Sequence, residues 1–261
     1  MPELPDLEIF KDNIFSKLIL KKLIDVKVFH PMKVNMPQQL LSEELVGREL
    51  LSINRIGKEM FFDFADSHVI SVHLMLNGET SIVSPSSVDE IKFKILSLNF
   101  EQQTVVFSDR GGLCTIKYRP IVNGVPDAFD QEFTLEYFLS KARKKALTNI
   151  KAFLIDQHIV KGIGNAYADE ILWTARISPK VLVGRIPQER MADLYHAINP
   201  VLKEAIRSIK SICPDIISGE ERSFLKVHNK NRKETETGFP IKVERIASKI
   251  TYFTDEQIFY P

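Results

Sequence analysis

The sequence predicts an α+β protein of several domains: an N-terminal β-sandwich with a helix in front of it, a helical second domain and a terminal β-hairpin. The spacing of the apolar residues predicts this order, because it is helical at the start, alternating from about Leu23 to Tyr118, and helical again afterwards. The length of 261 residues and the hydrophobic content of 44% allow one large domain or two modest ones. We place the domains at 1–122, 131–222 and 223–261.

The first element is a short helix at the N-terminus. Leu7, Phe10, Ile14 and Leu18 recur at helical spacing, which predicts one apolar face. Asp6 precedes this run and is a suitable N-cap, because its carboxylate can accept a hydrogen bond from a free N–H of the first turn.

The region from Leu23 to Tyr118 contains short β-rich runs that polar turns separate at intervals of roughly ten residues. The runs include MFFDF, VISVHLML, FKILSLNF and TVVFSD. This pattern is typical of a β-sandwich or a barrel, and the segment from Pro120 to Asp130 resembles a linker in its Pro, Gly, Asn and Asp content.

The second half of the chain is predicted to be helical. The four expected helices are 133–150, 150–159, 166–174 and 187–209, with interruptions at GIGN and at Pro179. After Ser218 the chain becomes polar, and a hairpin around Gly238 is expected to join a basic stretch to KVERIASKITYF.

Composition excludes several classes of protein. Only Cys114 and Cys213 occur and neither lies in a CxxC, so neither a disulfide framework nor a cysteine metal site is predicted. The chain has no run of eighteen apolar residues and has acids near its start, which predicts a cytosolic protein without a membrane span. The net charge of +1 does not indicate nucleic acid, and the basic clusters at 141–151 and 226–233 could be solvated faces.

Pro2 and Glu3 could carry chemistry. If Met1 is removed, Pro2 becomes a free secondary amine, and an α-amino group titrates near about 7.7 to 8, so that part of it is neutral at pH 7. Such an amine could attack a sugar C1′, and the Glu3 carboxyl beside it could move protons to and from the opening sugar. Both residue types are also common after an initiator methionine.

The segment IDQHIVKGIGNAYADEIL, from Ile155 to Leu172, predicts two helices joined by a tight glycine turn. Gly162 and Gly164 permit positive φ angles and close approach of the backbone. Asn165 and the N-terminus of the following helix could direct N–H groups at a phosphate. An isolated GxGN is also typical of a plain turn between helices.

PELPD at the start, together with this helix–two-turns–helix segment, resembles the formamidopyrimidine-DNA glycosylase/endonuclease VIII family, and the similarity in layout extends over nearly the whole chain. The resemblance implies that Pro2 is a Schiff-base nucleophile and that Glu3 is its acid/base partner. It also implies that Lys58, in RIGKEMFFDF, lies in a β-turn near the phosphate beside the lesion and acts in strand cleavage.

The same resemblance implies the DNA contacts. Gly164 and Asn165, together with Lys151, match the phosphate-binding part of the helix–two-turns–helix motif, and affinity would come mainly from counterion release. Such enzymes extrude the damaged nucleotide and fill the gap with side chains. Leu76, in HLMLNG, occupies the wedge position, and Arg110, in SDRGG, matches the arginine that faces the orphaned base.

The chain departs from the family pattern at three places. Gly111 replaces the phenylalanine that often follows this arginine, which could shift preference toward mismatched, looped or single-stranded DNA. A histidine near the strand before this loop is absent, with Glu90 and Ile91 in its neighbourhood. The terminal finger usually holds zinc with two CxxC pairs, but no cysteine follows Cys213.

A zincless finger is therefore implied. The positions that correspond to the zinc ligands are Thr235, Thr237, Thr254 and Gln257. We expect the finger to be held by an apolar hairpin core comprising Phe239, Ile241, Ile250, Tyr252 and Phe253. Lys249 lies near the place of the phosphate-gripping arginine, where it offers a point charge and not a fork.

The leading hypothesis is a monomeric DNA glycosylase with abasic-site lyase activity, without metal or other cofactor, that acts on damaged duplex or single-stranded DNA in the bacterial cytosol or nucleoid. A second hypothesis is a non-catalytic binder of damaged or distorted DNA on the same scaffold, and a third is an RNA- or ribosome-associated helical module. The sequence does not specify the lesion, the base opposite it, the choice between β- and β,δ-elimination, or removal of Met1.

Overall fold

The structure is a computed structural model that describes residues 1–261, and it divides the chain into two compact units. The sandwich unit contains residues 1–2, 6–123 and 213–220, and the helical unit contains residues 3–5, 124–212 and 221–261. The final segment, which we expected as a separate domain at 223–261, is thus grouped with the helices. Each unit has its own apolar core.

Helix α1 spans Leu4–Leu18, and its apolar face is the one that the sequence predicts. Leu7, Phe10, Ile14 and Leu18 are all buried in the core of the sandwich unit. The expected cap is wrong, because the helix begins two residues before Asp6. Asp6 therefore lies inside the first turn, where it is buried.

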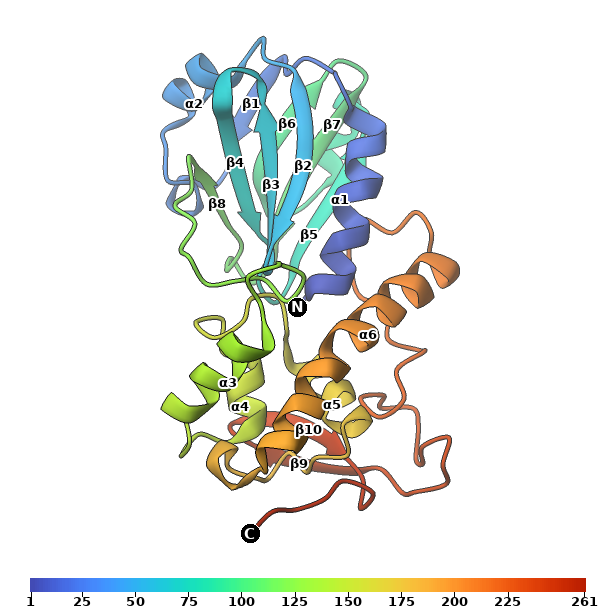
Figure 1. Cartoon of the computed structure of the whole chain (residues 1–261). Helices are drawn as coiled ribbons and strands as arrows, with labels where there is room; N and C mark the ends of the chain where they lie inside the picture. Colours follow the sequence, from blue (N-terminus) through green and yellow to red (C-terminus); the bar gives the residue numbers. More distant parts are fainter. The chain divides into compact units, whose positions relative to one another are not determined.

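The strands form two four-stranded antiparallel sheets, so the architecture is the sandwich and not the barrel (Figure 1). One sheet has the order β1-β6-β7-β5 and the other has the order β2-β3-β4-β8. Their bounds are β1 Asp25–Val28, β2 Leu50–Ile56, β3 Glu59–Phe64, β4 His68–His73, β5 Gly78–Val83, β6 Lys94–Phe100, β7 Gln103–Asp109 and β8 Thr115–Tyr118.

Aromatic side chains fill the space between the sheets. Phe62 meets Phe107 edge to face at 5.6 Å between ring centroids, and Phe64 stacks on Phe100 at 6.4 Å. A helix that the sequence did not predict, α2 at Gln38–Leu45, adds Leu41 and Leu45 to this core. Short 3₁₀ helices lie at Pro31–Lys33, Ala65–Ser67 and Pro85–Glu90.

The helical unit contains α3 (Leu135–Lys144), α4 (Ile150–Ile155), α5 (Asn165–Thr174) and α6 (Gln188–Ile212), with a 3₁₀ turn at Val183–Arg185. The first expected helix, 133–150, ends earlier than predicted, at Lys144, and α4 starts as a separate helix that Asn149 caps. Its side-chain oxygen accepts hydrogen bonds from the N–H groups of Lys151 and Ala152. Phe138, Phe153 and Tyr167 are fully buried in the common core of these helices.

The terminal hairpin consists of β9 (Lys242–Ile246) and β10 (Lys249–Phe253). The two-residue turn between these strands is Ala247–Ser248. Both residues have positive φ angles, of 49° and 64°. Such a turn usually contains Asn-Gly or Asp-Gly, so the sequence carried no signal for it. The hairpin that we expected around Gly238 is a separate, shorter turn. Glu234 forms an antiparallel bridge with Pro240, and the Thr235 N–H donates to the Phe239 carbonyl at 3.0 Å.

Among the helices, none combines the length and the apolar character that crossing a membrane requires.

The strained turn provides a test of the hairpin register. The double substitution Ala247→Asn with Ser248→Gly should raise the free energy of unfolding by about 0.5–1 kcal/mol, because the new residues adopt positive φ angles at lower cost. Urea denaturation measures this change. The same pair placed at Gly238 and Phe239 should destabilise or leave stability unchanged, and a gain there instead would contradict the observed turn.

Candidate functional site

One end of the sandwich gathers three segments that carry candidate residues. The pairing of Met60 with Val72 sets the start of β3 beside the end of β4, and the pairing of Gly78 with Asp109 sets the start of β5 beside the end of β7. The β2–β3 turn, the β4–β5 loop and the β7–β8 loop therefore lie at the same end. These segments contain Lys58, Leu76 and Arg110, respectively.

Lys58 lies at the tip of a two-residue hairpin turn between β2 and β3. Gly57 precedes it with a φ of 62°, a conformation that glycine adopts without strain. The Arg55 guanidinium braces the turn, because it donates to the Gly57 carbonyl at 3.0 Å and to the Glu8 carboxylate at 2.7 Å. Burial raises the pKa of Glu8, but Arg55 and Lys11 outweigh this effect, so the pKa is lowered. The Glu8 carboxylate that binds Arg55 therefore stays ionised.

The loop that carries Leu76 is a tight connection from β4 to β5. A Cβ on Gly78 would lie 2.2 Å from the Leu74 carbonyl oxygen, so only glycine fits there. The Met75 N–H donates to Nδ1 of His73 at 3.0 Å, and burial is the main reason that the pKa of His73 is lowered. Leu76 projects from this loop with 56% of its surface exposed.

Asp109 organises the loop that follows β7. Its buried carboxylate accepts hydrogen bonds from the N–H groups of Gly111, Leu113 and Cys114 at 2.6–2.7 Å. Burial raises the pKa of Asp109, but these bonds prevail and the pKa is lowered. Arg110 remains exposed. Sequence reasoning missed Asp109, although an acid two residues before a pair of glycines is a typical signal for such a turn.

Pro2 is buried in the sandwich unit, and its nitrogen is joined to Met1 in a peptide bond. The Met1 ammonium pairs with the carboxylate of Glu220. An amide nitrogen is not a nucleophile, so chemistry at Pro2 requires that Met1 be removed.

Glu3 belongs to the helical unit, where it caps the N-terminus of α5. Its carboxylate is 4% exposed and accepts from the Ala166 N–H at 2.9 Å and from the Tyr167 N–H at 3.4 Å. A Cβ on Gly164 would lie 2.3 Å from the Glu3 carboxyl carbon. Gly164 has an ordinary extended φ of −125°, so it is needed for space, whereas Gly162 has a φ of 99°.

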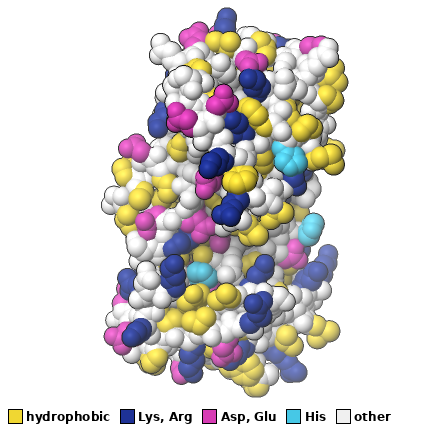
Figure 2. Space-filling model, turned by 180° about the vertical axis from the view of Figure 1, so that it is seen from behind, with side chains coloured by type: hydrophobic (Ala, Val, Ile, Leu, Met, Phe, Trp, Pro, Cys, Tyr) yellow, Lys and Arg dark blue, Asp and Glu magenta, His cyan; other side chains and the backbone are white.

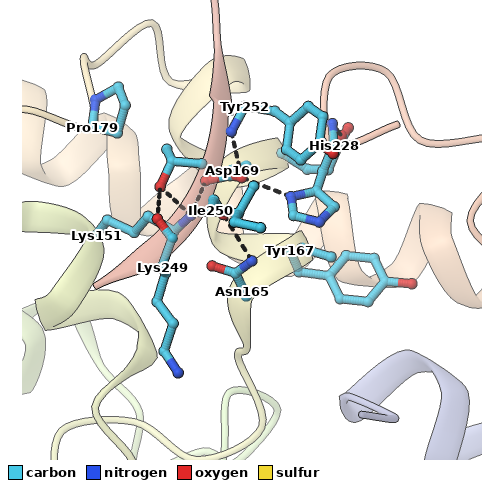
Figure 3. A network of polar contacts seen from close by, with 12 residues as sticks. Lys151, Asn165, Tyr167, Asp169, Pro179, His228, Lys249, Ile250 and Tyr252 are labelled. Atoms are coloured by element: carbon cyan, nitrogen blue, oxygen red, sulfur yellow. Dashed lines mark hydrogen bonds and ion pairs between the residues drawn. The ribbon is translucent and has the colours of Figure 1, made fainter. Parts of the chain in front are cut away.

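Asn165 and Lys249 lie on either side of the Ile250 backbone (Figure 3). The Asn165 amide donates to the Ile250 carbonyl at 3.0 Å, while its side-chain oxygen is buried without a hydrogen-bond partner. Lys249 directly precedes Ile250 and is exposed. The hairpin thus brings together two of the expected phosphate contacts.

Lys151 differs from our expectation of a phosphate contact. Its side chain is fully buried, and its ammonium meets the Asp169 carboxylate at 2.7 Å, the Thr251 hydroxyl at 2.7 Å and the Ile250 carbonyl at 3.2 Å (Figure 3). An ammonium has three protons, and these acceptors use all of them. Burial lowers the pKa of Lys151, and Asp169 opposes this shift. Lys151 therefore fixes the hairpin and does not face a ligand.

Asp169 connects the same hairpin to the segment before it. Its second oxygen lies 2.7 Å from Nδ1 of His228 and accepts from the Tyr252 N–H at 2.9 Å. Its neighbour Glu170 accepts from the backbone N–H groups of residues 226–228, although burial raises the pKa of this carboxyl. Two adjacent acids on α5 thus bind two stretches of the finger.

The residues at the zinc positions of the finger surround a carboxylate. The Glu256 side chain is 3% exposed and accepts five hydrogen bonds. The donors are Trp173 at 3.1 Å, Arg176 at 3.2 Å, Thr235 at 3.4 Å, Thr237 at 2.8 Å and Thr254 at 3.2 Å. Hydroxyl, indole and guanidinium donors suit an anion, and this set lacks the thiolates and imidazoles of structural zinc sites.

Gln257 completes this arrangement, because its amide binds the Thr254 N–H and the Ile177 carbonyl, both at 2.9 Å. The apolar hairpin core that we expected is wrong in part. Phe239 and Ile250 are 42% and 53% exposed, whereas Phe253 is buried. Polar contacts to Glu256 and Asp169, and not such an apolar core, stabilise the finger.

Basic side chains are mixed with acidic and hydrophobic ones on the face that Figure 2 displays. This mixture agrees with the net charge of +1. On this face, contact with phosphate would depend on individual basic residues and not on a continuous positive surface.

Two family models match the chain. The model of the formamidopyrimidine-DNA glycosylase N-terminal domain matches residues 1–115, and the model of the formamidopyrimidine-DNA glycosylase H2TH domain matches residues 125–215. Together they cover the β-sandwich and the four helices described above.

Curated relatives are similar over most of their length. The chain is 30% identical over 237 residues to the formamidopyrimidine-DNA glycosylase of Carboxydothermus hydrogenoformans, covering 88% of this chain and 89% of the relative. It is 26% identical over 267 residues to the enzyme of Lactococcus lactis subsp. lactis, covering 97% of each.

The fold is also similar to a solved structure of the Lactococcus lactis protein bound to DNA that contains an oxidised pyrimidine. The TM-score is 0.85 at 25% identity, over 97% of this chain and 98% of the other. A complex of a mutant of the same protein with Fapy-dG DNA gives a TM-score of 0.84 at 25% identity, with the same coverage.

The sandwich, the H2TH helices and these relatives define a DNA glycosylase, a repair enzyme that acts on damaged bases. The chain belongs to the formamidopyrimidine-DNA glycosylase/endonuclease VIII family, in a variant with a zincless finger.

The Glu256 contacts predict a defined pH dependence of stability. Glu256→Gln should lower the free energy of unfolding at pH 7 by about 1–3 kcal/mol, because a neutral amide replaces the buried hydrogen-bonded anion. Burial raises the pKa of Glu256, but the Thr237, Trp173 and Thr254 bonds outweigh it, and the pKa is lowered. The stabilisation by ionised Glu256 is thus fully present above the pKa of the unfolded chain, about 4.3. It is lost as the pH falls through the lower pKa that Glu256 has in the folded protein.

Fluorescence of Trp173, the one tryptophan in the chain, can follow this unfolding. The exposed Glu244→Gln is the matched control and should change stability by less than about 0.5 kcal/mol. A chelator should change neither protein. A difference between wild type and Glu256→Gln that stays constant from pH 7 to pH 3 would contradict the assignment.

Lys151 and Lys249 should behave differently when the charge is removed. Lys151→Met should cost about 3–5 kcal/mol of stability, because Asp169 is left buried without its cation. The double variant Lys151→Met, Asp169→Asn should recover much of this loss.

Lys249→Met should leave stability unchanged and weaken binding to DNA. The slope of the logarithm of the binding constant against the logarithm of the salt concentration should fall by about one.

Urea denaturation and binding titrations at several salt concentrations give both quantities. If Lys151→Met were as stable as wild type and changed only the salt dependence, Lys151 would be a phosphate contact after all.

Proposed function

We propose that this enzyme is a bifunctional DNA glycosylase and abasic-site lyase that removes oxidised bases through a Schiff base at Pro2. The observation that carries the proposal is the placement of Glu3. Its buried carboxylate is fixed by the N-terminus of α5, at a glycine that leaves room for it, in the residue directly after Pro2. A carboxyl group is therefore fixed on the residue that directly follows the nitrogen that would become the nucleophile.

The first steps release the base. After removal of Met1, the Pro2 nitrogen attacks C1′ of the damaged nucleotide, and the electron pair of the glycosidic bond leaves with the base, which takes up a proton. The Pro2 nitrogen passes its proton to the Glu3 carboxylate, the C1′–O4′ bond breaks and Glu3 delivers that proton to O4′. The nitrogen lone pair then forms an iminium bond to C1′.

The later steps cut the strand. Loss of a proton from C2′ breaks the C3′–oxygen bond, and the 3′ phosphate leaves with those electrons. Water then hydrolyses the iminium and restores the Pro2 amine. In this scheme Lys58, which Arg55 and Gly57 hold at the tip of its turn, acts near the flanking phosphate.

The DNA contacts of the proposal are divided between the units. Leu76 and Arg110 would occupy the space that the extruded nucleotide leaves, and Asn165 and Lys249 would bind phosphates. The oxidised-pyrimidine and Fapy-dG complexes of the Lactococcus lactis protein support oxidised bases as the substrate class. Damaged duplex and single-stranded DNA are both included.

Non-catalytic binding of distorted DNA is the second candidate, and Gly111 favours it. Without a large side chain at that position, the loop contributes less to opening a normal duplex. This candidate predicts binding to gapped or bent DNA without base release.

Borohydride trapping tests the proposal. Protein whose mature N-terminus is shown by mass spectrometry to be Pro2 should form a covalent adduct with abasic-site DNA, because borohydride reduces the iminium to a stable amine. Pro2→Gly should reduce the adduct. Glu3→Gln should slow base excision by about 10²–10⁴-fold and abasic-site cutting by less, since general acid catalysis is lost.

The exposed Glu189→Gln is the matched control for Glu3→Gln and should react like wild type. No adduct on a panel of abasic and oxidised-base substrates would refute the lyase, and tight binding with no turnover would establish the second candidate. Methionine retained on active protein would refute the role of Pro2.

A further inference from the structure

Phe93 is an unusual residue in the sandwich unit. It lies in the bend between the 3₁₀ helix at Pro85–Glu90 and strand β6, and 57% of its surface is exposed. Its φ is 56°, and it is the one aromatic residue of the chain with a positive φ. Bulky residues in this conformation are rare and concentrate at functional sites, because the rest of the structure must hold them there.

The backbone of Phe93 is fastened to the loop that carries Arg110. Its carbonyl accepts a hydrogen bond from the Asp109 N–H at 3.0 Å, and the next residue, Lys94, pairs with Ser108 across the sheet. The backbone from which the aromatic ring projects is therefore held by the same residue, Asp109, that shapes the arginine loop.

Phe93 and Arg110 line a common cavity of about 860 Å³. Other residues of its wall are Asn77, Glu79, Asp109 and Gly111. The charged groups have both signs, and the Asp109 carboxylate is already occupied by three backbone N–H groups. Mixed charge beside an aromatic ring suits an uncharged, flat, polar molecule such as a nucleobase better than it suits a phosphate.

The arginine loop, Arg110–Cys114, has no aromatic side chain of its own, and a side chain at Gly111 would be tightly packed. A Cβ there would lie 3.3 Å from Nδ2 of Asn77 and 3.3 Å from the Asp109 carboxylate. An aromatic group that stacks in this cavity must therefore come from another segment, and Phe93 is the aromatic residue of its wall.

We propose that Phe93 determines specificity by stacking on the base opposite the damaged nucleotide, in place of the aromatic side chain that Gly111 lacks. The Phe93 ring stacks on the face of the orphaned base, and the Arg110 guanidinium meets its edge. The inference rests on the proposed function, since an orphaned base exists only after the lesion has been extruded.

A thermodynamic cycle tests this inference by removing the Phe93 side chain, the opposite base, or both, and comparing the binding affinities. Two duplexes carry a tetrahydrofuran abasic analogue, opposite cytosine in one and opposite a second tetrahydrofuran in the other. Phe93→Ala should weaken binding to the first duplex by about 5- to 100-fold, the range expected for loss of one base–aromatic stack. It should change binding to the second by less than about twofold, because no base is present to stack.

Three further variants make the result specific. Phe93→Trp should bind like wild type, because a larger ring also stacks. Phe259→Ala removes an aromatic residue of nearly the same exposure, 58%, outside the cavity and should have no effect on either duplex. Leu113→Ala removes an exposed apolar side chain of the arginine loop that does not line the cavity, and it should show no dependence on the opposite base.

The inference would be overturned if Phe93→Ala weakened binding to both duplexes equally. It would also be overturned if Leu113→Ala, and not Phe93→Ala, weakened binding in a way that depends on the opposite base. Failure of the proposed function gives a different result: wild-type protein would then form no borohydride adduct, whether or not it prefers the tetrahydrofuran duplex to undamaged DNA. Unchanged melting temperatures of the variants show that the fold is intact.

Discussion

The buried carboxylate of Asp169 imposes the constraint on which the helical unit depends. An ionised acid in a protein interior must be matched by a cation and by hydrogen-bond donors, or the fold loses several kcal/mol. Lys151, His228 and the Tyr252 N–H meet this demand, and they come from three segments far apart in the chain. Satisfying one charge therefore fixes the β9–β10 hairpin on α5 and sets Asn165 and Lys249 beside each other.

Much of the fold could be predicted from the sequence because it follows local rules. The apolar face of α1, the two sheets and the four helices all follow from the spacing of hydrophobic residues, and the family followed from PELPD and the glycine turn. The turn at Ala247–Ser248 and helix α2 could not be predicted, because their conformations depend on tertiary packing and leave no turn or period signal.

The site was harder to predict because burial decides what a side chain does. Lys151 has the charge of a phosphate ligand, but its ammonium is consumed by internal acceptors that no local pattern reveals. Gly164 was expected to shape a phosphate turn, whereas its missing side chain makes room for Glu3. Asp109 and Phe93 attracted no attention in the sequence, since their importance arises from a backbone hydrogen bond between neighbouring strands.

The finger built around Glu256 has a chemical consequence. Zinc-binding thiolates are converted by peroxide to sulfenic and higher acids, and the metal is then released. Threonine hydroxyls, an indole N–H and a carboxylate have no such reaction under the same conditions. The contacts that hold the finger of this DNA glycosylase therefore include no thiolate that peroxide can oxidise, and they do not depend on a supply of metal.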